Sequence, residues 1–272
     1  MTELGSPVTD HHLALEGSTL TLDWAGVTDV GRRRAHNEDS YVAEAPLFVV
    51  ADGMGGHSAG DVASDAVVRR LHEAATAPFL TTDAVEEALL RATEEIAVAA
   101  ADTELGVGTT VTGAFLSLDD DEPSFTVFNV GDSRVYLLDA GVLRQVTVDH
   151  SVVQEMVDAG MLHPDDAESH PDSNVITRAV GFDVEPRPDY WRVPLRPGQR
   201  LLVCSDGLTK ELDARAIATT LGAADGASGA AADLVEQAVA AGGRDNVTAV
   251  VVVVRGTSPA GDAEPDETTV PR

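Results

Sequence analysis

In the stretch VVADGMGGHSAG, residues 49–60, an apolar run is followed by an aspartate and then by several glycines. The apolar residues Leu47 to Ala51 predict a buried strand, and the pair Asp52–Gly53 would end it. An Asp–Gly pair is a common turn, because glycine leaves the backbone free to change direction. The stretch alone therefore leaves two interpretations of Asp52, a turn residue or a working carboxylate.

The composition excludes several classes of protein. The chain has 272 residues, of which 43% are hydrophobic, enough for one large or two small globular domains. Its formal net charge is −28 and Lys210 is its only lysine, so nucleic acid and anionic membranes are unfavourable partners. Cys204 is the only cysteine, which excludes an intrachain disulfide and a thiolate zinc site. Since the sequence has neither a signal-peptide pattern nor an apolar run that could span a bilayer, it predicts a cytoplasmic protein.

Apolar periodicity predicts alternating blocks of strands and helices. The blocks indicate an α+β fold in which helices cover antiparallel sheets, because consecutive strands are joined by short turns. Residues 1–22 are mixed and polar and predict an N-terminal extension, whereas residues 256–272 predict a disordered acidic tail. Strands are expected at residues 46–51, 108–118, 124–131, 134–141, 200–205 and 248–254, and helices at 58–77, 83–101, 151–160, 211–221 and 229–241.

Four of these strands carry an aspartate at one end: Asp52, Asp132, Asp206 and Asp245. Turn chemistry explains any one of them, but neighbouring strands would bring several carboxylates into one cleft. Carboxylates crowded together resist joint ionisation unless a cation lies among them. Ligands that are all oxygens favour a hard ion, so the four acids predict a site for Mg²⁺ or Mn²⁺.

A positive segment, GRRRAHNEDS at residues 31–40, accompanies the acids. Three consecutive arginines could form a solvated basic turn. Arginine, however, binds phosphate through two parallel hydrogen bonds and stays charged at any working pH. The segment therefore adds a candidate anion site to the candidate metal site.

The motifs together resemble those of the metal-dependent serine/threonine phosphatases of the PPM (type 2C) family, and the small bacterial enzymes most of all. The resemblance covers residues 23 to 255 and implies a fold of two packed antiparallel β-sheets flanked by helix pairs, an α-β-β-α sandwich. Eight motifs carry it in order: RAHNED, VVADGMGGHSAG, GVGTTVT, NVGDSRVYLL, DHSVVQEMVDAG, HPDSNVITRAVG, CSDGLTKEL and GGRDNVTAVVV.

The resemblance implies two tightly bound Mn²⁺ or Mg²⁺ ions. Asp52 matches the carboxylate that bridges both ions, and the carbonyl of Gly53 matches a ligand of the second ion. Asp206 and Asp245 match ligands of the first ion. Asp132 matches a carboxylate associated with a third, weaker ion.

Other positions match residues around the ions. Arg34 matches the arginine that grips the substrate phosphate. Glu38 and Asp39 match acids that hold metal-bound waters, and Asn246 is placed with them. Residues 149–181 resemble the mobile flap beside the active site.

The implied reaction is the removal of phosphate from phosphoserine and phosphothreonine in proteins by a water that bridges the ions. Phosphorylated proteins, serine/threonine kinases among them, would be the partners of a monomeric enzyme. Met54 stands where some members place a histidine proposed as general acid, and either His57 or a metal-bound water could supply that proton.

Four alternatives stay open. One is a two-metal nuclease, although a net charge of −28 opposes the binding of a polyanion. A cysteine-dependent phosphatase would use Cys204, but Lys210 cannot offer the two-pronged phosphate contact of an arginine. A dedicated phosphatase of one signalling protein, of the anti-sigma-factor antagonist type, would have the same site. A non-catalytic regulatory module would lack one or more of the metal acids, all of which are present.

Overall fold

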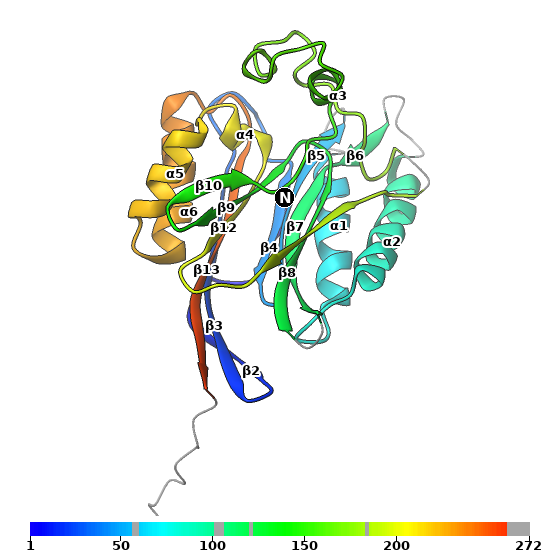
Figure 1. Ribbon diagram of the computed structural model, residues 1–272. Coiled ribbons are helices and arrows are strands. Elements are labelled where there is room, and N and C mark those ends of the chain that lie inside the picture. Colours follow the sequence, from blue (N-terminus) through cyan, green and yellow to red (C-terminus); the bar gives the residue numbers. More distant parts are fainter. Residues whose placement is uncertain (56–59, 101–105, 120–121, 183–184, 260–272) are drawn as a thin grey trace, which may run out of the picture.

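The computed structural model describes residues 1–55, 60–100, 106–119, 122–182 and 185–259. Two β-sheets pack face to face, and helices cover the outer face of each, as Figure 1 shows. The fold is thus the α-β-β-α sandwich that the resemblance implies. The predicted α+β class is confirmed.

The second sheet is antiparallel throughout, and the first is antiparallel except for one pair. In that pair the short strand β1 (Glu3–Leu4) runs parallel to β4 (Asp39–Glu44). The first sheet has the order β1 (Glu3–Leu4), β4 (Asp39–Glu44), β5 (Leu47–Gly55), β7 (Val111–Asp119), β8 (Glu122–Val130) and β11 (Asp189–Pro194), with β6 (Val107–Thr109) beside β5. The second has the order β10 (Val142–Gln145), β9 (Arg134–Asp139), β12 (Arg200–Cys204), β13 (Val247–Pro259), β3 (Ser18–Asp29) and β2 (Val8–Leu15).

Strand β5 shows how the layers are built. Its side chains alternate between two cores, because successive residues of a strand point to opposite faces. Leu47 and Val49 face α1 (Gly60–Ala74) and α2 (Thr82–Ala100), whereas Phe48 and Val50 enter the core between the two sheets. A strand buried on both faces reads as a continuous apolar run, which is why the sequence predicts this strand so clearly.

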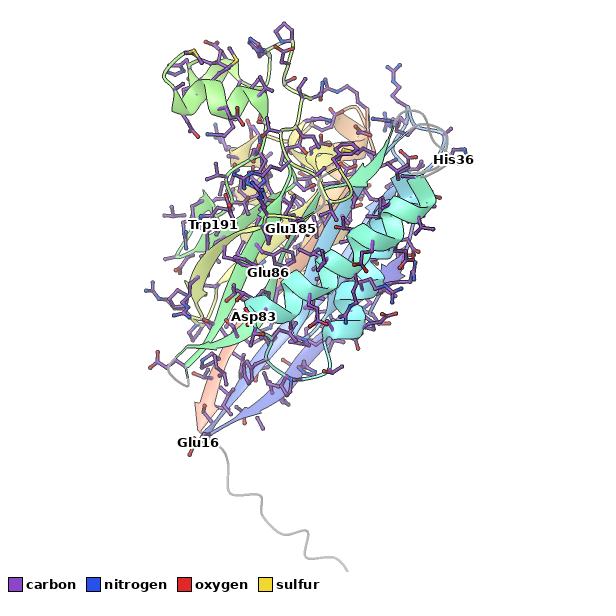
Figure 2. All side chains as sticks on the ribbon, turned by 90° about the vertical axis from the view of Figure 1, so that its right-hand side faces the viewer. Glu16, His36, Asp83, Glu86, Glu185 and Trp191 are labelled. Atoms are coloured by element: carbon purple, nitrogen blue, oxygen red, sulfur yellow. The ribbon has the colours of Figure 1, made fainter. Side chains whose placement is uncertain are left out.

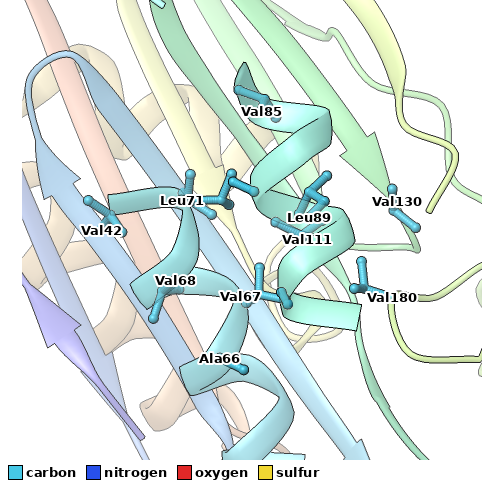
Figure 3. Packing of buried hydrophobic residues seen from close by; sticks show 14 of the residues in the cluster. Val42, Ala66, Val67, Val68, Leu71, Val85, Leu89, Val111, Val130 and Val180 are labelled. Carbon is cyan, nitrogen blue, oxygen red and sulfur yellow. The ribbon is translucent and has the colours of Figure 1, made fainter. Parts of the chain in front are cut away.

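Helices α1 and α2 bury one apolar stripe each against the first sheet. Figure 3 shows Val67 and Leu71 of α1 close to Leu89 of α2, over Val111 of β7. The second sheet is covered in the same way by α4 (Asp206–Thr209), α5 (Ala214–Ala223) and α6 (Gly226–Ala241).

A segment within residues 149–181 stands above the sheets in Figure 1. It contains α3 (Val152–Asp158) and a 3₁₀ turn at Pro164–Asp166. The Ser151 side chain caps α3 by accepting a hydrogen bond from Gln154 N, and Gly160 follows the helix with φ 69°. The predicted helix end at Gly160 is therefore confirmed.

Two predicted domain boundaries fall inside strands. The boundary at residue 23 lies within β3, and β1 and β2 before it already pair with sheet strands. Strand β13 runs on to Pro259, so the first residues of the predicted tail are paired with β3, and residues 260–272 lie outside the described part. Strand β2 escapes sequence analysis because it is an edge strand whose alternate side chains face water.

Candidate active site

The candidate site is a cavity of about 480 Å³ at the sheet edge where β5 ends and β13 begins. His36, in the loop before β4, marks this end of the molecule in Figure 2, and Glu16, between β2 and β3, marks the opposite end. Seven of the nine predicted site residues line the cavity: Arg34, Glu38, Asp52, Gly53, Asp132, Asp206 and Asp245. The other two, Asp39 and Asn246, do not line it.

Asp52 is held by the backbone around it. Its amide N donates to Thr110 Oγ1 at 3.1 Å, and its carbonyl accepts from Thr110 N at 2.9 Å. A Cβ on the next residue, Gly53, would collide with the carbonyl oxygens of Gly60 and Glu38. Glycine is therefore required at residue 53, because the start of α1 approaches the strand end backbone to backbone.

Asp39 lies directly opposite Asp52 in the pairing of β4 with β5, and it is completely buried. Thr248 Oγ1 donates to its Oδ2 at 2.5 Å, but its Oδ1 has no hydrogen-bond partner among the described residues. Burial raises the pKa of Asp39 to about 7. Two facing carboxylates destabilise a sheet unless a cation or a proton compensates them.

Asp206 and Asp245 contact cations of the chain itself. Lys210 Nζ lies 2.5 Å from Asp206 Oδ2 and 3.4 Å from Asp245 Oδ2. Arg34 holds both oxygens of Asp245, with Nε 2.8 Å from Oδ1 and Nη2 2.9 Å from Oδ2. Asp206 Oδ1, by contrast, is buried and has no partner within the described ranges.

Asp132 follows Gly131 at the end of β8, where Gly131 takes a φ of 113°. The turn is fixed by His150, whose Nδ1 accepts from Gly131 N at 3.1 Å and whose amide N donates to Gly131 O at 2.9 Å. Ser133 Oγ lies 2.9 Å from Thr110 Oγ1, which joins this turn to the end of β5. The aspartates of two strands are thus fixed relative to each other.

Asn246 ties the arginine loop to the start of β13. Its Oδ1 accepts from Glu38 N at 2.9 Å, and its Nδ2 donates to the carbonyls of Val30 and His36 at 3.0 Å each. It therefore positions Glu38 and the loop that carries Arg34, and it does so from outside the cavity.

The acids of the cavity raise one another's pKa values. Burial, and after it the charge of Asp39, raises the pKa of Asp52 well above its usual range. Burial raises the pKa of Asp132 to about 7, with repulsion from Asp206 adding to it. Burial also raises the pKa of Asp206, although Lys210 opposes that shift. Such a site favours any cation that can enter it.

The donor set fits hard divalent ions. It consists of carboxylate and carbonyl oxygens, and one buried carboxylate oxygen of the cavity lining, Asp206 Oδ1, lacks a partner in the described part of the chain. Within the described ranges no three acid, histidine or cysteine side chains already converge on a single point suited to an ion. The carboxylates of Asp206 and Asp245 meet Lys210 and Arg34 instead.

Sequence analysis missed several residues of the cavity. Thr110, Asn174, Ile176, Lys210 and Arg244 also line it. Asn174 and Ile176 come from the segment that resembles the flap, so this segment lies beside the cavity, and its mobility stays a prediction. The only available signal for Lys210 was its spacing four residues after Asp206, which places the two side chains together only if a helical turn forms.

Two further sequence expectations concern individual residues. Met54 lines the cavity, and His57 lies outside the described residues. Cys204 is completely buried in β12, and burial raises the pKa of its thiol to about 12. Since a thiolate is the reactive form, Cys204 does not support the cysteine-dependent alternative.

Comparison with known proteins gives consistent matches. Residues 31–238 match the protein phosphatase 2C family. The serine/threonine phosphatase Stp of Listeria monocytogenes is 38% identical over 238 residues, which are 83% of this chain and 93% of that protein. The serine/threonine protein phosphatase PstP of Mycobacterium tuberculosis is 40% identical over 241 residues, 87% of this chain but 46% of that longer protein.

Solved structures agree with the sequence matches. The crystal structure of the M. tuberculosis phosphatase PstP superposes with a TM-score of 0.79 at 36% identity, covering 86% of this chain and 99% of that one. A structure of the PstP catalytic domain in complex with two manganese ions superposes with a TM-score of 0.77 at 37% identity, covering 86% of this chain and 99% of that chain.

Proposed function

The chain belongs to the protein phosphatase 2C family and is a serine/threonine protein phosphatase, and we propose that it works with two divalent ions held by the aspartates of the cavity. The observation that carries this proposal is the convergence of Asp52, Asp132, Asp206 and Asp245 on one cavity. Like charges gathered from both sheets need a cation, and oxygen ligands favour Mn²⁺ or Mg²⁺. None of the helices in the described part of the chain has the length and apolarity needed to cross a membrane.

Four residues would hold the ions. Asp52 would contact both, the carbonyl of Gly53 would contact the second, and Asp206 and Asp245 would contact the first. When bound there, the ions would polarise the phosphoryl group and supply an activated, bridging water as the nucleophile. The structure of the PstP catalytic domain in complex with two manganese ions supports a two-ion site in this chain.

The neighbouring acids would orient solvent. Glu38 lines the cavity, and its backbone amide donates a hydrogen bond to Asn246, which fixes the position from which its side chain extends. Asp39 lies opposite Asp52 in the pairing of β4 with β5. One of its carboxylate oxygens accepts a hydrogen bond from Thr248, and the other has no partner in the described part. Both would accept hydrogen bonds from waters around the ions, which orients those waters.

Arg34 would bind the phosphate of the substrate. Its side chain is 53% exposed at the rim of the cavity, and it already grips a carboxylate, Asp245, through two nitrogen atoms. A phosphate offers the same pair of oxygen acceptors with more charge. Binding in this way would place the phosphorus over the aspartates.

The substrates would be proteins phosphorylated by serine/threonine kinases, including the kinases themselves. The −28 net charge opposes nucleic acid as a substrate. A dedicated phosphatase for one signalling protein would use the same cavity, and a panel of phosphoproteins distinguishes the two possibilities.

The test is metal-dependent hydrolysis of matched phosphopeptides. We expect release of phosphate from phosphoserine and phosphothreonine peptides with Mn²⁺ or Mg²⁺, loss of release in EDTA, and recovery when the ion is added back. A phosphotyrosine peptide of the same sequence is the specificity control, and thermal melting checks that the chelated protein stays folded. Full activity after exhaustive chelation would overturn the proposal.

A further inference from the structure

Lys210 contacts two carboxylates that the resemblance assigns to the first ion, and its charge also acts on Asp132, which matches the residue associated with a third, weaker ion. It follows α4 directly, and its amide N donates to Asp206 O at 2.8 Å, which closes a helical turn. The turn brings its ammonium group onto Asp206 and Asp245. A second cavity, of about 350 Å³, shares five lining residues with the first, so these residues lie between the two cavities: Asp132, Asn174, Asp206, Lys210 and Arg244.

The backbone of Lys210 is anchored. Arg244 Nη2 donates to the Lys210 carbonyl at 2.5 Å, while Arg244 Nε pairs with Glu211 Oε1 at 2.8 Å. The Lys210 side chain is only 32% exposed. Lys210 is thus fixed at its backbone carbonyl and paired at its ammonium group, unlike the usual surface lysine, whose ammonium is solvated.

The two carboxylate oxygens of Asp206 differ in their contacts. Oδ2 contacts Lys210, whereas Oδ1 is buried without a partner among the described residues. Asp206 can therefore offer Oδ1 to an ion without losing its contact with Lys210. The carboxylates of Asp52, Asp132, Asp206 and Asp245 surround the ammonium, with the guanidinium groups of Arg34 and Arg244 on the same walls.

Lysine is chemically suited to replace an ion there. Its ammonium is a compact point charge, whereas a guanidinium is planar and spreads its charge over three nitrogens. Although burial opposes the charged form, the Asp206 and Asp245 carboxylates raise the pKa of Lys210 above its usual range. Lys210 is the only lysine of the chain, and all its other basic residues apart from histidine are arginines.

We propose that the Lys210 ammonium is a built-in cation that takes the place of the third divalent ion beside Asp132 and Asp206, so that the protein binds two ions and not three. The inference rests on the proposed two-ion site. A third ion next to Asp132 would meet the ammonium at short range, and that repulsion excludes it. Lys210 thus supplies a positive charge near Asp132 that cannot dissociate from the protein.

The experiment counts Mn²⁺ ions by calorimetric titration and by native mass spectrometry, neither of which depends on turnover. Wild-type protein is expected to bind two ions. Lys210→Met removes the charge at nearly the same side-chain length and is expected to bind a third ion, at least about tenfold more tightly than any further ion on wild type. The double variant Lys210→Met/Asp132→Asn is expected to return to two.

Arg33→Met is the matched control, because it removes one positive charge from an exposed neighbour of Arg34 that does not line the cavity. It should leave the count at two. A wild-type count of three, or a count unchanged by Lys210→Met, overturns the inference. A wild-type count of zero overturns the two-ion site itself, so the two failures are distinguishable. If Lys210→Met does not fold, the wild-type count and Lys210→Arg, expected to stay at two, decide the question.

Discussion

The outer face of α1 and α2 and the catalytic cavity both gather carboxylates, but they give them opposite partners. On the helices, Glu95 lies between Arg69 and Arg70, with contacts of 2.9 and 2.8 Å. Hydrogen bonds from Arg69 lower the pKa of Glu95. In the cavity, Asp52 has Asp39 opposite it, and burial with that repulsion raises its pKa.

The difference supports the proposal that the cavity binds cations. Glu95 meets two arginines on an exposed helix face, so it is satisfied in the folded chain and needs nothing from outside. Acids that meet acids are a cost to folding unless a ligand compensates them, so the fold retains them for binding. The four predictions below test this comparison.

The largest effect is expected from Asp52→Asn. The amide keeps the shape but loses the charge that would hold both ions, so kcat should fall at least about a thousandfold. Metal-free stability should stay level or rise, because one of several crowded buried charges has gone. Phosphopeptide kinetics and thermal melting in EDTA measure the two effects. A variant that keeps its activity, or that loses stability in EDTA, would refute the assignment of Asp52 to the ions.

Arg34→Ala should have the next largest effect, and mainly on KM. Loss of a charged hydrogen-bonding partner commonly costs about 1.5–3 kcal/mol, and the 53% exposure of Arg34 favours the lower end of that range. We therefore expect KM for phosphopeptides to rise roughly tenfold while Mn²⁺ affinity stays nearly unchanged. Arg33→Ala is the control, with the same charge change outside the cavity. Equal KM values for the two variants would remove Arg34 from the phosphate site.

The sequence predicts the site residues that lie next to apolar strands better than those placed by strand register or by a short helix. Asp132, Asp206 and Asp245 flank apolar strands, so periodicity locates them. Asp52 follows the apolar run of β5, but the prediction that Asp52–Gly53 ends this strand is wrong, because the strand continues to Gly55 and pairs there with β6. The cavity does bring all four aspartates together. The roles of these acids at the ions stay predictions.

Asp39 and Lys210 show what sequence alone could not supply. The facing of Asp39 and Asp52 depends on strand register, which only the complete sheet defines. The contact of Lys210 depends on a four-residue helix too short to leave a periodic pattern. Edge strand β2 escaped for a similar reason, since a half-exposed strand of polar residues has a weak signal.

The third prediction concerns pH and the metal-free protein. Burial raises the pKa of Asp132 to about 7 from an ordinary value of 3.8, so the folded state holds its proton more tightly than the unfolded state. The resulting stabilisation is complete below pH 4 and is lost as the pH rises through about 7. Melting temperature in EDTA should therefore fall more between pH 5 and pH 8 in wild type than in Asp132→Asn, whose amide does not titrate. Parallel pH profiles for the two proteins would contradict the raised pKa.

The smallest effect is expected from Glu95→Gln on the helix face. The variant leaves Arg69 and Arg70 without their shared carboxylate, but all three side chains are about a third exposed, so solvent screens much of the interaction. We expect the melting temperature to fall by only about 2 °C at low salt. The decrease should shrink in 1 M NaCl, because salt screens exposed ion pairs, and kcat and KM should stay at the wild-type values. This result is the reverse of that expected for Asp52→Asn, where activity is lost and stability kept. A Glu95→Gln variant with impaired turnover and normal melting would mean that paired and unpaired acids cannot be told apart by their partners, and the comparison between the two regions would fail.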